Sequence, residues 1–270
     1  HAGQRSCHPV FRASGLVSGE TSVGGIAGSN FDSMSNRHIT LIEHCSFSGS
    51  VEGLNEIGGV VGCNYQSIIS NCYNSGSVKG SFKVGGLAGI NDERGQIIYS
   101  YNNGPVSGAA NANAIGGLLG RNESSIIEVC FNAGKVTGDY CVGGCIGIGY
   151  FSSMSNCYNI GAVIGSEYVG GCVGLNSDST VVNSFNAGSI AGSKKTGGLV
   201  GENNDLSSVS KSFWDKEVTL LDYSAGGFAK TTAEMKRSST FLWDFNEIWQ
   251  ISEGITYPYF INAYQNRSLH

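Results

Sequence analysis

The side chains best suited to chemistry are two carboxylic acids, Asp139 and Glu167, which lie 28 positions apart in a chain that repeats every 27 residues. If successive repeats stack as strands, the two acids would lie on neighbouring corners, roughly 5 Å apart. That separation suits the acid and the nucleophile of a retaining glycosidase. Stacking produces it automatically, however, and neither corner carries a basic residue or a histidine that would stabilise developing negative charge. The pair therefore indicates polysaccharide cleavage only as an alternative function.

The corners that precede a repeated glycine block also carry side chains that suit ligand contact. Stacking would hold equivalent corners within about 5 Å of one another. Two insertions, at Phe31–Thr40 and Ala109–Ala114, add loops of the kind that often form the binding face of a solenoid. A solvated turn is the simpler interpretation of each corner. The candidate ligand-binding residues are Asp139, Tyr140, Glu167, Tyr168, Lys194 and Lys195.

The cysteines and histidines do not form a metal-binding pattern. The nine cysteines include no C-x-x-C pair and the five histidines no H-E-x-x-H motif, so we expect no zinc site, no metalloprotease centre and no cofactor. Cysteines recur instead at one repeat position, which Ser100 and Ser184 occupy in other repeats, and this favours small buried side chains over disulfides. Cys145 and Cys172 are the pair to test first for a bond between repeats. The recurring cysteines are Cys45, Cys72, Cys130 and Cys157.

The composition limits the fold and the partners. Gly occupies 41 of 270 positions and Pro only 3, without a three-residue period, which excludes collagen and Pro-rich linkers. Hydrophobic residues make up 40% and charged residues 14%, so the chain should fold. With a net charge of −5 and no basic run longer than Lys194–Lys195, the chain lacks a surface for nucleic acid. No apolar stretch reaches 18 residues, so we expect no membrane insertion.

An internal repeat of about 27 residues dominates the sequence. A block of the form V/I-G-G-x-x-G recurs seven times, with spacings of 34, 27, 31, 27, 27 and 27 residues. A second signature, G-x-V/I-x-G, ends five residues before the block, except in the repeat that begins at Gly104, which has three extra residues. A fixed period of this length predicts a solenoid. The blocks begin their glycine pairs at Gly24, Gly58, Gly85, Gly116, Gly143, Gly170 and Gly197.

Each repeat should contain three short strands separated by Gly and Asn corners, since these residues accept positive φ. The expected fold is therefore all-β: a parallel β-helix solenoid, right-handed by the strong default for parallel crossovers. Equivalent residues should form ladders with a spacing of about 4.8 Å. Cys72 should face inward beside an aromatic column that runs from Tyr73 to Phe185. The three expected ladders are Val51, Val78, Val106, Val136, Val163 and Ile190; Ile42, Ile69, Ile97, Ile127, Met154 and Val181; and Ile26, Val60, Leu87, Leu118, Cys145, Cys172 and Leu199.

The repeats predict two domains, a β-helix over residues 1–210 and a C-terminal capping segment over residues 211–270. Thr231 to Glu234 match a capping box, which predicts one short helix over about 232–239. Aromatic residues gather in the same segment. They could form a ligand platform, but a cap over the open end of the solenoid is the favoured interpretation. These residues are Trp214, Phe241, Trp243, Phe245, Trp249, Tyr257 and Tyr259.

The block V-G-G-L-A-G at residues 84–89, with N-C-Y-N-x-G-x-V-x-G at 71–80, resembles the GLUG motif, and the likeness extends over residues 15 to about 203. The tail, with Ser212–Asp215 and Trp243–Phe245, is similar to the segment that closes GLUG arrays. The resemblance implies a bacterial cell-surface or secreted protein, with relatives among immunoglobulin A proteases, in which the repeats form β-helical regions beside other domains. The zinc-binding helix of those proteases has no counterpart here, so their activity does not carry over.

These features predict a non-catalytic scaffold or adhesin module, extracellular or on the cell surface, whose corners bind a host glycan or a protein. The first residues lack an apolar signal core, so we expect flanking domains of a longer chain. The alternative is a polysaccharide-cleaving β-helix enzyme. Ice binding by a flat face would need a column of threonines, which the repeats do not supply.

Overall fold

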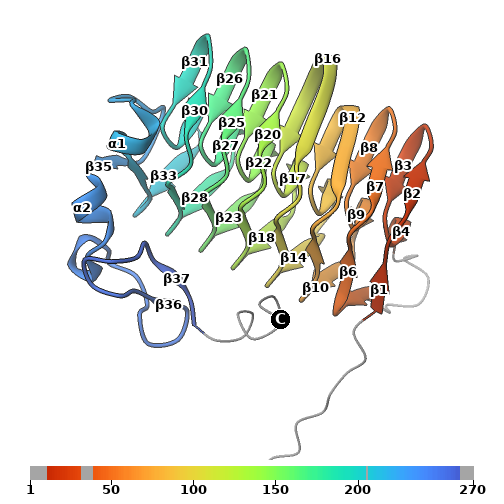
Figure 1. Cartoon of the computed structure of the whole chain (residues 1–270), viewed down its shortest axis with the longest axis horizontal. Coiled ribbons are helices and arrows are strands. Elements are labelled where there is room, and N and C mark those ends of the chain that lie inside the picture. The colour runs from red at the N-terminus through yellow and green to blue at the C-terminus, as the bar shows by residue number, and fades with distance from the viewer. Residues whose placement is uncertain (1–10, 32–38, 205, 262–270) are drawn as a thin grey trace, which may run out of the picture.

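The computed structural model describes residues 11–31, 39–204 and 206–261. The chain winds in coils along one axis and ends in a small cap (Figure 1). All strand pairs between coils are parallel among the described residues, and an antiparallel pair occurs only within the cap. The predicted all-β parallel solenoid with a C-terminal cap is therefore confirmed.

Most coils contain five short strands, where the sequence predicted three. The glycine pair of each block divides one predicted strand in two, because the chain bends there. A residue with left-handed backbone geometry, such as Asn71 with φ 54°, divides another. The divided strands are two to five residues long in most coils and stack with equivalent strands of the coils on either side.

Sheets A and D form two adjoining sides of the solenoid. The left-handed column that includes Asn71 and Asn156 lies between them and turns the chain from one to the other. In the described residues, sheet A contains β1 (Phe11–Ala13), β6 (Cys45–Phe47), β11 (Tyr73–Asn74), β15 (Tyr101–Asn102), β19 (Phe131–Asn132), β24 (Tyr158–Asn159), β29 (Phe185–Asn186), β34 (Phe213–Asp215) and β35 (Phe228–Lys230). Sheet D contains β5 (Leu41–Glu43), β10 (Ile68–Ser70), β14 (Gln96–Ile98), β18 (Ile126–Glu128), β23 (Ser153–Ser155), β28 (Thr180–Val182) and β33 (Ser208–Ser210).

Sheet B folds back on itself in every coil, so that two strand segments form a projecting arm, at the top of Figure 1. Its strands are β2 (Leu16–Ser18), β3 (Thr21–Gly24), β7 (Ser50–Glu52), β8 (Asn55–Gly58), β12 (Ser77–Gly85), β16 (Val106–Gly116), β20 (Val136–Thr137), β21 (Tyr140–Gly143), β25 (Val163–Ile164), β26 (Glu167–Gly170), β30 (Ile190–Ala191) and β31 (Lys194–Gly197). Sheet C follows each glycine pair and contains β4 (Ala27–Phe31), β9 (Val61–Tyr65), β13 (Ala88–Asp92), β17 (Leu119–Glu123), β22 (Ile146–Tyr150), β27 (Val173–Ser177) and β32 (Val200–Asn203).

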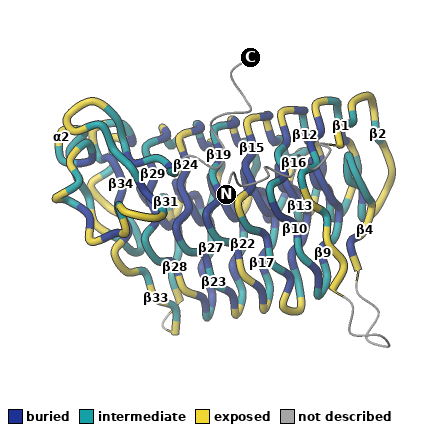
Figure 2. The backbone as a smooth tube through the Cα atoms, turned by 90° about the horizontal axis from the view of Figure 1, so that it is seen from below, coloured by how far each residue is buried: buried dark blue, intermediate teal, exposed yellow. Residues whose placement is uncertain are grey.

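The three predicted ladders are confirmed and form two cores. Val136 pairs in register with Val106 and Val163, and this valine ladder packs inside the arms against the ladder that includes Ile115 and Val142. The other two predicted ladders meet in a second core between sheets A, C and D. Figure 2 shows buried strand segments along the axis, with exposed residues mainly at the corners and in the cap.

Glycine is required where the two cores meet. A Cβ on Gly144 would lie 2.1 Å from the carbonyl oxygen of Gly171 and 2.3 Å from Asn159 Cγ. Asn159 belongs to a buried column of amides in sheet A, in which its Nδ2 donates to Asn186 Oδ1 at 2.8 Å. The second glycine of each of the five central blocks approaches this column in the same way, and only a residue without a side chain fits there.

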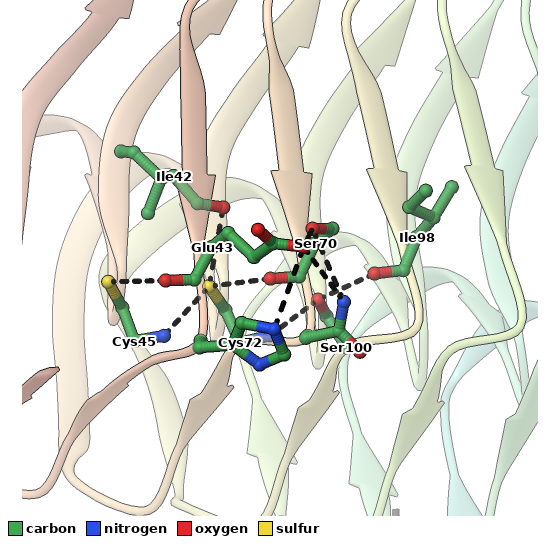
Figure 3. Close-up of polar contacts among 9 residues, drawn as sticks. Ile42, Glu43, Cys45, Ser70, Cys72, Ile98 and Ser100 are labelled. Atoms are coloured by element: carbon green, nitrogen blue, oxygen red, sulfur yellow. Dashed lines mark hydrogen bonds and ion pairs between the residues drawn. The ribbon is translucent and has the colours of Figure 1, made fainter. Parts of the chain in front are cut away.

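A column of thiols and hydroxyls confirms that Cys72 faces inward (Figure 3). The backbone N–H of Cys45 donates to Cys72 Sγ at 3.4 Å, and that of Cys72 donates to Ser100 Oγ at 3.1 Å. Both Cys and Ser occur in this column because either side chain accepts that bond and donates its own proton to a carbonyl two residues earlier. All eight cysteines among the described residues are free, Cys145 and Cys172 included, and Cys7 lies outside those residues. Burial raises the pKa of the Cys145 thiol well above its ordinary range.

The cap has two functions in the fold. Its first part closes the end of the solenoid: Ser224 Oγ accepts from the backbone N–H groups of Leu199 and Val200, and β35 extends sheet A. Its second part folds back along the side and covers the aromatic column, where Trp249, Trp243 and Phe260 pack against the rings. The expectation of an end cap alone was therefore incomplete.

The cap contains short elements joined by turns. Thr231 forms the predicted capping box with Glu234, but the helix ends early and a separate 3₁₀ turn follows. Neither α-helix in the described part of the chain has the length and apolar character that spanning a membrane requires. The elements are α1 (Lys216–Thr219), α2 (Thr232–Met235), η1 (Ser238–Thr240), β36 (Trp249–Gln250) and β37 (Tyr259–Phe260).

Candidate functional site: the arm tips

The predicted ligand-binding residues lie at and beside the tips of the arms. A glycine begins each tip, and a Cβ on Gly138 would lie 2.8 Å from Ile115 Cγ1 in the arm core. This glycine allows the chain to cross the end of the core and return as β21. The tips of adjacent coils are joined by backbone bonds, such as that from Glu167 N to Asp139 O at 3.0 Å.

The Asp139 carboxylate joins its own tip to the tips of the coils on either side. Its Oδ1 accepts from Ser166 Oγ at 3.4 Å, and its Oδ2 accepts from the backbone N–H of Asn111. Glu167 pairs in register with Tyr140 and so is offset by one residue from Asp139. The two acids therefore lie at adjacent tips, as predicted, and the backbone bonds align Asp139 with the residue before Glu167.

Tyr168 and Lys195 form a second group. The Lys195 ammonium lies 4.7 Å from the centroid of the Tyr168 ring and 3.2 Å from Glu202 Oε1 in sheet C. The hydrogen bond with Glu202 is the main reason that the pKa of Lys195 is raised. Both tip residues have left-handed geometry, with φ 57° and 46°. Sequence reasoning missed Glu202, because it lies in the next strand and carries no motif of its own.

The remaining candidates belong to a single column on the outer face of the arms. Tyr140, Glu167 and Lys194 are in register, so their side chains leave the sheet on the same side. The column also contains residues that sequence reasoning missed. Their place in the repeat would have identified them, since each lies three positions before the first glycine of its block. The additional members are Thr21, Asn55, Phe82 and Asn113.

The two insertions differ. Of Phe31–Thr40, residues 32–38 lie outside the described residues, and the exposed Phe31 ring stacks on Tyr65 at 5.2 Å. Ala109–Ala114 lengthens the tip of β16, and the buried Ala112 joins the arm core. The longer tip borders an open depression of about 370 Å³, which is also lined by Glu52 and Lys79.

Metal chemistry has no visible site in the described residues, where no group of three or more His, Cys, Asp or Glu side chains comes together. The buried carboxylate of Asp215 is satisfied within the cap. Its Oδ1 accepts from two backbone N–H groups of α1, and its Oδ2 accepts from Thr232 and Tyr257 hydroxyls. We interpret this cluster as a structural clamp.

Comparison with known proteins identifies the repeat. The family model of the GLUG motif matches residues 19–52 and 53–79. No curated protein matches the chain. Among solved structures, a chain described as a "putative immunoglobulin A1 protease from Bacteroides ovatus" is similar, with a TM-score of 0.55 and 22% identity over 93% of this chain and 74% of that one. At this identity the likeness shows the fold alone. The chain therefore carries GLUG-motif repeats and folds as a parallel β-solenoid.

Proposed function

We propose that this chain is a non-catalytic scaffold or adhesin module of a bacterial cell-surface or secreted protein, and that its arm tips contact a ligand or partner. The observation that carries the proposal is the contrast between core and tip. The Val136 ladder keeps similar apolar residues from coil to coil, whereas the register column through Tyr140 changes its chemistry at almost every coil. Core packing leaves this exposed column free to vary, and binding residues commonly lie on such loops held by a rigid scaffold.

The hydrogen bonds of Asp139 count against the alternative, a polysaccharide-cleaving enzyme. Its carboxylate accepts one hydrogen bond from the tip of each neighbouring coil, and it is offset from Glu167. An acid and a nucleophile that act on one glycosidic bond must flank it together. The pair that first indicated glycosidase chemistry is thus better explained as turn structure.

The comparisons support the proposed location. The GLUG match and the likeness to a chain described as an immunoglobulin A1 protease of Bacteroides ovatus favour a bacterial protein that acts outside the cell. Neighbouring domains of a longer protein would then supply any catalysis, with the solenoid as spacer and contact surface.

Binding and hydrolysis assays on the same preparation test the proposal. The labelled chain should bind a subset of a glycan, mucin and host-protein array, and incubation with polysaccharides should release no reducing ends. Array binding of the double variant Tyr168→Ala/Lys195→Ala shows whether the group formed by these two residues makes the contact. Release of reducing ends that is lost in Asp139→Asn and Glu167→Gln would overturn the proposal in favour of the enzyme.

A further inference from the structure

One face of the arms carries aromatic rings and polar groups in strict alternation. The register runs from Asn55 through Phe82, Asn113 and Tyr140 to Glu167, one residue from each successive coil. Because these residues pair directly across parallel strands, all five side chains project from the same face. Phe82 is 52% exposed and Tyr140 40% exposed, although aromatic residues are more commonly buried.

The two rings are two rungs apart, which corresponds to about 9.6 Å along the solenoid. Neither ring contributes to a described core cluster. Aromatic rings are enriched at binding interfaces, where they supply a large apolar contact area. The rigid ladders beneath fix the distance between the rings before any ligand arrives, so binding would not have to order them.

Asn113, between the rings, has unused hydrogen-bonding capacity. Its Oδ1 is covered by neighbouring atoms and accepts no hydrogen bond from the described residues. A covered amide oxygen without a donor is unfavourable, so a ligand hydroxyl that reached this oxygen would gain a hydrogen bond. The amide of Asn55 and the carboxylate of Glu167 flank the rings on the outer sides.

This arrangement suits an extended sugar chain. Pyranose rings with equatorial hydroxyls have apolar faces that stack on aromatic rings and polar edges that bond amides and carboxylates. Alternate sugars of an extended β-linked chain present the same face, which matches rings on alternate coils. Single-stranded nucleic acid also stacks on aromatic rings, but it requires a basic groove. The stretch from Asn55 to Glu167 has no cation in the column, and the net charge of the chain is −5.

We propose that Asn55, Phe82, Asn113, Tyr140 and Glu167 form a strip that binds an extended chain of β-linked pyranose sugars. The proposal rests on the binding role proposed above and gives it a ligand class and a surface.

Affinity electrophoresis of the full 270-residue chain tests the strip. Hydroxyethylcellulose and glycol chitin are the β-linked probes, and α-linked dextran is the comparison polymer. Both β-linked probes should retard the wild type, and dextran should not. Phe82→Ala and Tyr140→Ala should each weaken binding roughly tenfold, and the double variant should abolish it. Leu54→Ala, at a neighbouring tip and 56% exposed, is the matched control and should bind like the wild type.

The outcomes separate this proposal from the one on which it rests. If β-linked probes do not retard the wild type, or retard the double variant equally, the strip is overturned. Array binding that survives in the double variant would leave the scaffold function standing and the strip refuted. Release of reducing ends from the β-linked probes by the wild type would instead contradict the scaffold function. Thermal melting should be unchanged in the exposed-ring variants, which excludes unfolding as the cause of lost binding.

Discussion

The indole Nε1 of Trp249 donates a hydrogen bond to Asn156 Oδ1 at 3.3 Å and so joins the cap to a corner 93 residues earlier in the chain. Trp249 is fully buried, and its ring lies 6.0 Å from that of Tyr158 and 6.1 Å from that of Phe185. The cap thus uses the aromatic column as its docking surface. The rings of Tyr158 and Phe185 are buried beneath it.

Removal of this anchor should detach the cap. Trp249→Ala should cost about 3–5 kcal/mol of unfolding free energy, because the lost ring leaves a large void against Tyr158 and Phe185. Urea unfolding, followed by the fluorescence of the remaining tryptophans, measures the cost. Leu242→Ala, 80% exposed in the same segment, should change the midpoint little. Equal midpoints in the two variants would contradict the assigned role of Trp249.

The clamp at Asp215 gives a second prediction. Asp215→Ala leaves two backbone donors and the Thr232 and Tyr257 hydroxyls without their acceptor, which should cost about 3 kcal/mol or more. Tyr257→Phe removes one donor and should cost about 1 kcal/mol. Thermal melting measures both, with the exposed Asp222→Ala as control. A Tyr257→Phe variant as unstable as Asp215→Ala would show that packing, and not the clamp, holds the cap.

The thiol and hydroxyl column predicts that serine can replace a buried cysteine with little loss of stability. Ser100 N donates to Cys130 Sγ at 3.4 Å, and both residues are buried. Cys130→Ser keeps an acceptor of similar size and should change stability by less than about 1 kcal/mol, whereas Cys130→Ala strands that N–H and should cost about 1–3 kcal/mol. Chemical denaturation of the two variants under reducing conditions decides the matter. The idea fails if alanine is tolerated as well as serine.

One coil offers a stabilising substitution. Gly149 stands where neighbouring coils have Asn122 and Asn176, and it interrupts their buried amide ladder. Gly149→Asn should stabilise the solenoid by about 1 kcal/mol, since it adds hydrogen bonds and reduces the freedom of the unfolded chain. A new Cβ would lie 3.3 Å from Ser152 Oγ, so that hydroxyl must rotate slightly. Gly149→Ala is the control that reduces the freedom of the unfolded chain without adding an amide, so the melting temperature should rise more for Asn than for Ala.

Acid should weaken one bond between coils. Burial alone would raise the pKa of Glu56, but hydrogen bonds from Lys83 and Ser22 outweigh it and hold the pKa below its ordinary value of 4.5. A lowered folded pKa gives stability that is present above pH 4.5 and is lost as the pH falls below it. Wild type should therefore exceed Glu56→Gln in urea midpoint at pH 7 but not at pH 3. Glu52→Gln, an exposed acid in β7, should show no such convergence.

Much of the fold was predictable because each repeat places the same residue types at the same positions. Val136 and Val163 recur at a fixed interval, and only stacking buries every member of such a ladder. The division into five strands was not predictable. It depends on left-handed corners at residues such as Tyr99 and Val129, with φ 54° and 50°. Neither residue type favours a positive φ, so the sequence does not predict a corner there. The solenoid imposes these conformations through bonds on either side of the corner.

The candidate site was predictable only in part. Tyr140, Glu167 and Lys194 were identified as neighbours, and their register confirms that they align. Tyr168 and Lys195 turn toward Glu202, which a pattern read along one repeat position cannot reveal. Phe82 and Asn113 were overlooked because the prediction relied on charged corners. It did not compare the residues that lie three positions before each glycine block.

The longer tip of β16 changes nothing beneath it. Three extra residues enter between Gly108 and Asn113, yet Ile115 and Gly116 stand opposite Val142 and Gly143 as though no insertion had occurred. Mutations that lengthen a tip or change its residues can thus be accepted without unfolding the solenoid. In such a solenoid a tip can change in length and composition while the strands of the rod beneath it keep their register.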